Sequence, residues 1–259
     1  MQTKENLTRI SYELALDLKK DNVIYAEIRF APLFHTKQGL TIEEVITAIL
    51  DGLKQVPIKI NLILCMMRGS NYEDNYKVIE AAYQFRNKGV VGIDLAGDEK
   101  NYPVNNFKEL FEIAKDKKIP FTIHAGEADT YLSVDNAINL GATRIGHGVK
   151  AIENNSTIEH IKQNNITLEI CPISNLNTKI YNDISSHPIK KLYDENISIT
   201  ISTDNRTVSN TTLNDTYQIL RDTFHFTKED FIKMNQNAIN ASFINEHEKE
   251  LLLKELIEQ

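Results

Sequence analysis

Short apolar, β-branched runs recur along this chain at nearly even spacing, and they limit the possible folds more than any other feature. The runs are Val23–Phe30, Ile58–Cys65, Val90–Leu95, Pro120–Ile123, Thr143–Ile145, Ile166–Ile170 and Ile197–Ile201. Their starts are about 29 residues apart on average, the length of a strand, a helix and their turns. Strict alternation of strand and helix predicts a parallel sheet.

Helical patterns fill the intervals between these runs and continue after the last one. Within the alternating region they cover Ile42–Val56, Asn75–Asn87, Phe107–Lys117, Leu132–Leu140, Ser156–Gln163, His187–Asp194 and Leu213–Thr223. A further helix, Lys4–Lys20, opens the chain, and Lys228–Asn240 and Glu246–Ile257 end it. Gly89, Gly141 and Asn165 each follow a helix and precede a strand, so we expect them to be left-handed helix caps.

The alternation leaves two folds open, a doubly wound open sheet and a closed barrel. No glycine-rich phosphate loop follows any strand, which disfavours the open sheet. Polar side chains gather where strands end, as on the catalytic face of a barrel. We therefore predict an α/β fold of the TIM-type (β/α)8 class, one domain over residues 1–259, with C-terminal helices. Only seven strands are readable, so we expect that the first strand is missing.

Composition excludes several classes of function. The formal net charge of −7 argues against a nucleic-acid partner, which usually requires a basic face. No apolar run approaches 18 residues, so no membrane span is expected. The chain has two cysteines, Cys65 and Cys171, each within or at the end of an apolar run. This rules out a disulfide scaffold and favours a reducing, cytoplasmic location.

The segment from Ile119 to Glu127 has the strongest chemical character. A short apolar run ends in His124, and two small residues then lead to Glu127. A strand that ends in this way would present a metal ligand beside a general acid or base. The segment alone is equally consistent with a core histidine capped by a solvated glutamate.

Two further polar residues follow strands. His147 lies between Gly146 and Gly148, and Asp204 follows the last strand. A histidine and an aspartate at strand ends, with a glutamate nearby, suit a zinc-class metal that keeps one position open for water. His147 could be a third ligand or could orient the attacking hydroxide. The other histidines fall in loops or helices, where a solvated or structural role is favoured: His35, His160, His187, His225 and His247.

Five segments in the same order resemble the motifs of the adenosine deaminase family, a metal-dependent branch of the amidohydrolase barrels. They are Asp94–Glu99 (DLAGDE), His124–Glu127 (HAGE), Arg144–Gly148 (RIGHG), Cys171–Asn175 (CPISN) and Ser202–Asp204 (STD). Tyr25–Pro32 also resembles the second strand of that family.

The resemblance implies zinc-dependent hydrolytic deamination of adenosine and 2'-deoxyadenosine to inosine and ammonia, in purine salvage, with a small purine nucleoside as the partner. His124 and Asp204 would bind Zn²⁺. Glu127 would donate a proton to purine N1, and His147 would orient and help activate the attacking hydroxide. The backbone N–H of Gly97 would contact the purine.

The chain departs from the family pattern in two places. The family begins with a strand ending in His-x-His, which supplies two zinc ligands, and this chain has no His-x-His. We therefore expect weak zinc binding by the chain alone. Asn205 stands where many members have aspartate; its amide could donate to purine N7, or it could be a turn residue. A catalytically inactive homologue and a deaminase of a related aminopurine such as adenine remain alternatives.

Overall fold

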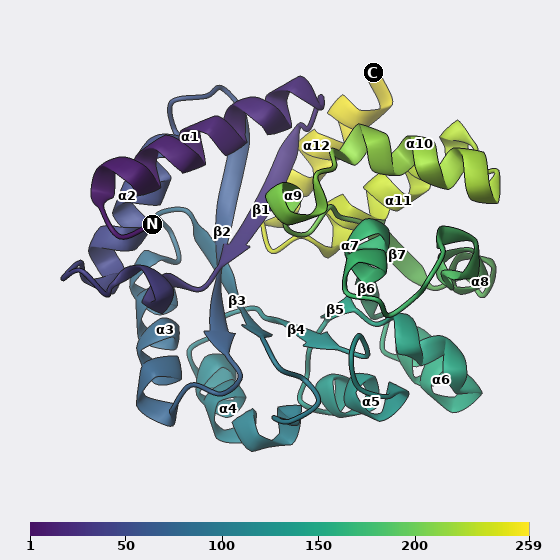
Figure 1. Ribbon diagram of the computed structural model, residues 1–259, viewed down its shortest axis with the longest axis horizontal. Helices are drawn as coiled ribbons and strands as arrows, with labels where there is room; N and C mark the ends of the chain where they lie inside the picture. Colours follow the sequence, from purple (N-terminus) through teal and green to yellow (C-terminus); the bar gives the residue numbers. More distant parts are fainter. Residues whose placement is uncertain (259) are drawn as a thin grey trace. The chain divides into compact units, whose positions relative to one another are not determined.

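The computed structural model describes residues 1–258 and contains seven parallel strands over that range (Figure 1). The strands are β1 (Tyr25–Phe30), β2 (Lys59–Met67), β3 (Val90–Ala96), β4 (Thr122–Ala125), β5 (Arg144–His147), β6 (Thr167–Ile170) and β7 (Ser198–Ile201). Each of them overlaps one predicted run. They form two sheets, ordered β1-β2-β3 and β4-β5-β6-β7, and every pairing is parallel. The predicted α/β alternation is therefore confirmed.

Helices follow the strands as the periodicity predicts. They are α1 (Lys4–Lys20), α2 (Ile42–Leu53), α3 (Tyr72–Phe85), α4 (Lys108–Asp116), α5 (Tyr131–Asn139), α6 (Asn155–Gln163), α7 (Pro172–Asn177), α8 (Ile189–Asp194), α9 (Arg206–Ser209), α10 (Leu213–Phe224), α11 (Lys228–Ala241) and α12 (Glu246–Glu258). The helices α7 and α9 are not among those that the sequence predicts. Gly89, Gly141 and Asn165 have positive φ angles, as expected of helix caps. None of the described helices is long and apolar enough to cross a membrane.

The chain divides into two compact units, and the first contains Met1–Gly97 and Glu109–Phe121. Its sheet, β1-β2-β3, carries α3 against β2 and β3, while α1 packs on α2. Inside this unit Arg29 Nη1 lies 3.1 Å from Asp94 Oδ2, and the Asp94 side chain is fully buried. The ion pair compensates the aspartate charge in a place that water does not reach.

The second unit contains Asp98–Lys108 and Thr122–Gln259. Across its four strands, one row of aligned residues is entirely apolar and fully buried: Ile123, Ile145, Leu168 and Ile199. Because side chains alternate along a strand, the neighbouring positions face the opposite side of the sheet. Apart from Gly146, those positions carry polar residues, among them His124, so the register that builds the core also places the polar groups together.

A buried ion pair lies among these polar positions. Arg144 Nε lies 2.7 Å from Glu169 Oε1, and both side chains are 7% exposed. The Thr122 hydroxyl donates to Glu169 Oε2 at 3.0 Å, and the Arg144 guanidinium stacks 3.9 Å from the Phe243 ring. The pair therefore connects three adjacent strands to the segment between α11 and α12. Cys65 and Cys171 are both buried and unbridged, as expected.

Candidate active site

His124 lies near the end of β4, on the polar face of the second unit's sheet. Its register partner on β5 is Gly146. A Cβ at position 146 would come within 3.1 Å of His124 Nδ1, so the imidazole occupies space that only glycine leaves open. The His124 and His147 rings lie 5.1 Å apart between centroids, at 57°. The structure thus brings together the two histidines selected from the sequence.

The backbone at the end of β5 is unusual. His147 has φ 62° and Gly148 has φ 68°, both in the left-handed region. A histidine there is strained, and such residues concentrate at functional sites. The Gly148 N–H donates to the Ala125 carbonyl at 3.0 Å, which ties this turn to the end of β4. His147 is 2% exposed, so its ring nitrogens are shielded from bulk water.

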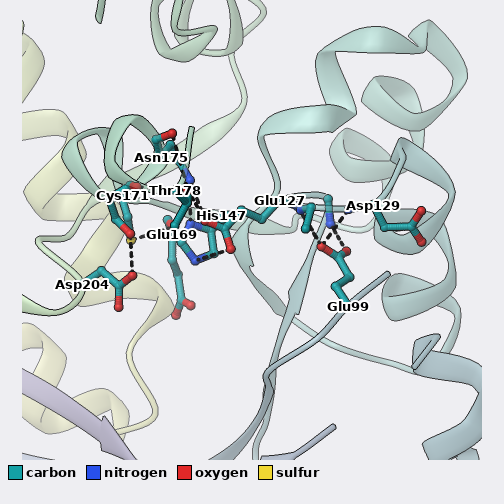
Figure 2. A network of polar contacts seen from close by, with 12 residues as sticks. Glu99, Glu127, Asp129, His147, Glu169, Cys171, Asn175, Thr178 and Asp204 are labelled. Carbon is teal, nitrogen blue, oxygen red and sulfur yellow. Dashed lines mark hydrogen bonds and ion pairs between the residues drawn. The ribbon is translucent and has the colours of Figure 1, made fainter. Parts of the chain in front are cut away.

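Glu127 belongs to a loop that a second, buried glutamate holds in place. Glu99 is 4% exposed and accepts hydrogen bonds from the backbone N–H groups of the four residues Gly126–Asp129 (Figure 2). It also accepts from the Ser133 hydroxyl. Five donors on one carboxylate leave the loop little freedom, which fixes the direction in which the Glu127 side chain leaves it. The sequence places Glu99 within the DLAGDE motif but does not predict this role.

The first turns of α7 connect Glu127 to His147. Pro172 begins this helix, at the position where proline is best tolerated. The Asn175 amide nitrogen, Nδ2, donates to Glu127 Oε1 at 3.0 Å and to His147 Nδ1 at 3.1 Å. Asn175 is fully buried. Thr178 also donates to Glu127 Oε1, at 3.3 Å. One amide therefore aligns the predicted acid with the predicted water-orienting histidine.

The polar atoms of Glu127 and His147 that Asn175 does not contact also lie close together. Glu127 Oε2 is 3.6 Å from His147 Nε2, and the Glu127 side chain is 20% exposed. Figure 2 shows the two side chains directed toward each other beside α7. Since Asn175 and Thr178 occupy Oε1, a proton carried by Glu127 would reside on Oε2.

Asp204 follows β7 and has φ 56°, which makes it, after His147, the second left-handed residue among the predicted site residues. The Ser174 hydroxyl, on α7, donates to Asp204 Oδ2 at 2.7 Å. Consecutive residues of α7 thus hold Asp204 on one side and Glu127 with His147 on the other. Asn205 is the N-cap of α9, where its side-chain oxygen accepts from the Val208 N–H at 3.1 Å. That contact leaves the Asn205 amide nitrogen as a donor.

Gly97 belongs to the first unit, just after β3, with φ 100°. A Cβ there would lie 3.3 to 3.4 Å from Met67 and Arg68, so both backbone angle and space favour glycine.

His187 is connected to the site, which the sequence did not reveal. It is 3% exposed, and its Nε2 lies 3.1 Å from Asn175 Oδ1. Its Nδ1 accepts the Ile189 N–H at 3.1 Å. Burial, aided by nearby His147, lowers the pKa of His187 to about 4. At the start of the predicted helix His187–Asp194 the sequence favours a solvated or structural role, and no local pattern points to Asn175.

The ligand types at this site suit zinc only in part. An imidazole and a carboxylate, His124 and Asp204, are groups that zinc takes. Within residues 1–258, however, no three or more His, Cys, Asp or Glu side chains gather in a way that could hold a metal ion. Catalytic zinc usually takes three protein ligands. The described residues therefore provide part of such a ligand set and do not by themselves fit a complete one.

Comparisons with known proteins place these features in context. The adenosine deaminase of Clostridium perfringens (strain SM101 / Type A) is 42% identical over 262 residues, 99% of this chain and 79% of that protein. The N6-mAMP deaminase of Arabidopsis has a TM-score of 0.92 and 26% identity, over 99% of this chain and 79% of that one. A zinc-bound amidohydrolase of Burkholderia ambifaria has a TM-score of 0.92 and 21% identity, over 99% and 73%.

These matches agree with the predicted fold class, since the solved neighbours, one of them a deaminase and one an amidohydrolase, have the TIM-barrel type of fold. The family model described as adenosine deaminase matches residues 1–259. The motifs, their order along the chain and the matched length all lead to the same conclusion: this chain belongs to the adenosine deaminase family of hydrolytic deaminases.

Proposed function

We propose that this protein deaminates adenosine and 2'-deoxyadenosine hydrolytically, giving inosine or its deoxy form and ammonia. The observation that carries the proposal is the pairing of Glu127 with His147 through one buried amide, with their other polar atoms 3.6 Å apart. An acid and a water-orienting group at this separation can reach a ring nitrogen and the oxygen that attacks the adjacent carbon. The curated relative named adenosine deaminase supports the choice of substrate.

In the proposed reaction Glu127 transfers a proton from Oε2 to purine N1. Protonation weakens the ring conjugation and makes C6 electrophilic. Water, oriented by His147, forms the new C–O bond at C6, and its proton leaves toward the C6 amino group. The resulting tetrahedral centre then breaks its C–N bond and releases ammonia. As the C6 carbonyl forms, the hydroxyl proton of that centre returns to the Glu127 carboxylate, which restores the acid. Glu127 acts as a general acid in this scheme.

Two further contacts would position the purine. The Asn205 amide nitrogen would donate to N7, because its oxygen already caps α9. The backbone N–H of Gly97 would contact the ring. Both roles follow from the family resemblance, and neither group takes part in bond making.

We also propose that the active protein depends on zinc, with His124 and Asp204 as two of its ligands. When bound, zinc makes water acidic enough to act as a nucleophile near neutral pH. The zinc-bound neighbour supports this requirement, and Ser174, which holds Asp204, would orient the carboxylate. Two buried, unbridged cysteines support a reducing location such as the cytoplasm, where the reaction would serve purine salvage.

A related aminopurine is the second candidate substrate. The Arabidopsis neighbour is named for N6-mAMP, at 26% identity, so substrates in this fold differ at the amino group and the ribose. An inactive homologue is the remaining alternative.

Turnover and metal content distinguish these readings. The purified protein is supplied with zinc, freed of excess metal and analysed for zinc per chain. It is then given adenosine, 2'-deoxyadenosine, adenine or AMP while ammonia and the deaminated base are measured. Fastest turnover of adenosine with bound zinc supports the proposal, and fastest turnover of adenine or AMP supports the second candidate. Absence of ammonia from every substrate at full zinc loading would refute both.

A further inference from the structure

We propose that His187 and Asn175 form a positioning relay that holds His147 in the tautomer with its proton on Nε2. The term "relay" refers here to the hydrogen-bonded series that begins at the Ile189 N–H and passes through these two side chains. Its catalytic consequence rests on the proposed function, because His147 is the residue proposed to orient water. The hydrogen-bond directions themselves are properties of the resting chain.

The relay begins at a backbone group whose direction cannot change. Ile189 is the first residue of α8, so its N–H has no carbonyl partner within the helix. It donates to His187 Nδ1 at 3.1 Å. A backbone N–H can only donate, so Nδ1 must accept, and a neutral ring then carries its proton on Nε2. Burial lowers the pKa of His187 to about 4, which keeps the ring neutral at pH 7.

The next hydrogen bond in the relay runs from His187 to Asn175. His187 Nε2–H points at Asn175 Oδ1, 3.1 Å away, and a carbonyl oxygen can only accept. This contact fixes which end of the amide faces which neighbour. The Asn175 NH₂ group must then face Glu127 and His147, and its two hydrogens are used at 3.0 and 3.1 Å.

The relay ends at His147. An amide NH₂ can only donate, so His147 Nδ1 must accept, and the neutral ring keeps its proton on Nε2. Asn175 is fully buried and His147 is 2% exposed, so water does not compete for these contacts. The Nε2–H bond then points into the space beside Glu127 Oε2.

A proton on Nε2 determines how His147 contacts the attacking water. It meets the attacking water as a hydrogen-bond donor, so it orients a lone pair of the oxygen and does not act first as the base. His187 touches neither substrate nor reacting atoms and is a positioning residue. The same amide keeps Glu127 Oε1 as an acceptor, which directs the acidic proton of Glu127 to Oε2.

Nitrogen NMR of ¹⁵N-histidine-labelled protein tests the relay without any turnover. Spectra recorded at about pH 8, where an ordinary histidine is neutral, distinguish the protonated from the bare nitrogen of each ring. The His147 signals are identified by their loss in a His147→Gln variant. We expect the proton of His147 on Nε2. A proton on Nδ1 would overturn the proposal even in a fully active enzyme.

Three variants test the link to His187. His187→Leu removes the donor, and we expect the His147 signals to become a mixture of tautomers and kcat to fall about 10- to 100-fold with little change in KM. His187→Gln retains an N–H near the Nε2 position and should restore most of both. Asn175→Asp replaces the amide donor by an acceptor and should move the His147 proton to Nδ1, which keeps a test available if the leucine variant does not fold.

A matched control is His160→Leu, since His160 Nδ1 pairs with Asp135 on α5, which is not a member of the relay. It should leave the His147 spectrum and kcat unchanged. If His187→Leu folds and its His147 tautomer matches that of the unmodified protein, the relay is refuted. If the tautomers respond as expected but no substrate is deaminated, the relay stands and the proposed function fails.

Discussion

Replacing Glu99 by glutamine would test how the loop that carries Glu127 is held. The Glu99 carboxylate accepts from four consecutive backbone N–H groups, Gly126–Asp129, and from the Ser133 hydroxyl. Glutamine has the same shape, but one of its terminal atoms is an NH₂ group that can only donate. In either orientation of the amide, that NH₂ group faces N–H or O–H groups that need an acceptor.

The size of the effect follows from which donors lose their acceptor. Hydrogen bonds to a charged group contribute roughly 1.5–3 kcal/mol each. The five do not add, because Gly126 N–H keeps the Ser133 oxygen at 2.8 Å and water reaches exposed Ala128. A net loss equal to one or two charge-assisted bonds, about 3 kcal/mol, is therefore expected for Glu99→Gln. In a domain of this size such a loss lowers Tm by about 6–12 °C.

Urea denaturation of the unmodified protein and of Glu99→Gln measures this loss. The matched control is Glu250→Gln, an exposed carboxylate on α12, which should change the free energy of unfolding by less than about 0.5 kcal/mol. We also expect kcat of the active enzyme to fall, because the acid leaves its position beside His147. The reasoning is wrong if Glu99→Gln unfolds within about 0.5 kcal/mol of the unmodified protein.

Three other changes have definite expected outcomes. Glu127→Gln should reduce turnover at least about 100-fold with unchanged zinc content, since it still accepts from Asn175 but has no acidic proton; retained activity would place the proton donor elsewhere. Lowering the pH from 7.5 to 5 should reduce the free energy of unfolding by about 2 kcal/mol through His187, whose pKa is about 4 in the folded protein and 6.5 in the reference state. The reason is that the unfolded chain binds the proton first. A free energy of unfolding that does not change over this pH range, or that changes equally in His187→Gln, would contradict this expectation. Arg144→Met should lower the free energy of unfolding, measured with urea, by about 3–5 kcal/mol, because it leaves Glu169 charged and buried. Adding Glu169→Gln should restore part of that stability. If it restores none, lost packing and not the unpaired charge causes the destabilisation.

Much of the fold was predictable because its signals are local. Each strand is a short apolar run, and one aligned row of such residues becomes the core of the second unit's sheet. The left-handed caps at Gly89 and Asn165 follow from the conformational freedom of those residue types. The helices α7 and α9 were missed because six and four residues are too short to establish a helical period.

The candidate site was predictable where chemistry and position coincide along the chain. His124 and Glu127 could be selected because a strand end, small residues and a carboxylate stand together. Glu99 and His187 act on residues distant in sequence, and only folding brings them there. Glu99 reaches a loop 27 residues later, and His187 reaches an amide 12 residues earlier. Glu99 and Asn175 did lie within the motifs that carried the family resemblance, whereas His187 had no such signal.

At positions 147 and 204 the left-handed backbone favours other residues than the reaction requires. Selection for stability and selection for activity therefore favour different side chains there. A residue other than glycine costs roughly 1–3 kcal/mol in that region, with the smallest cost for asparagine and aspartate. Glycine at either position would relieve the strain and also remove an imidazole or a carboxylate from the site. A library of this chain selected only for survival at high temperature should therefore accumulate glycine or asparagine at positions 147 and 204. Such a population would keep the fold and lose the site first.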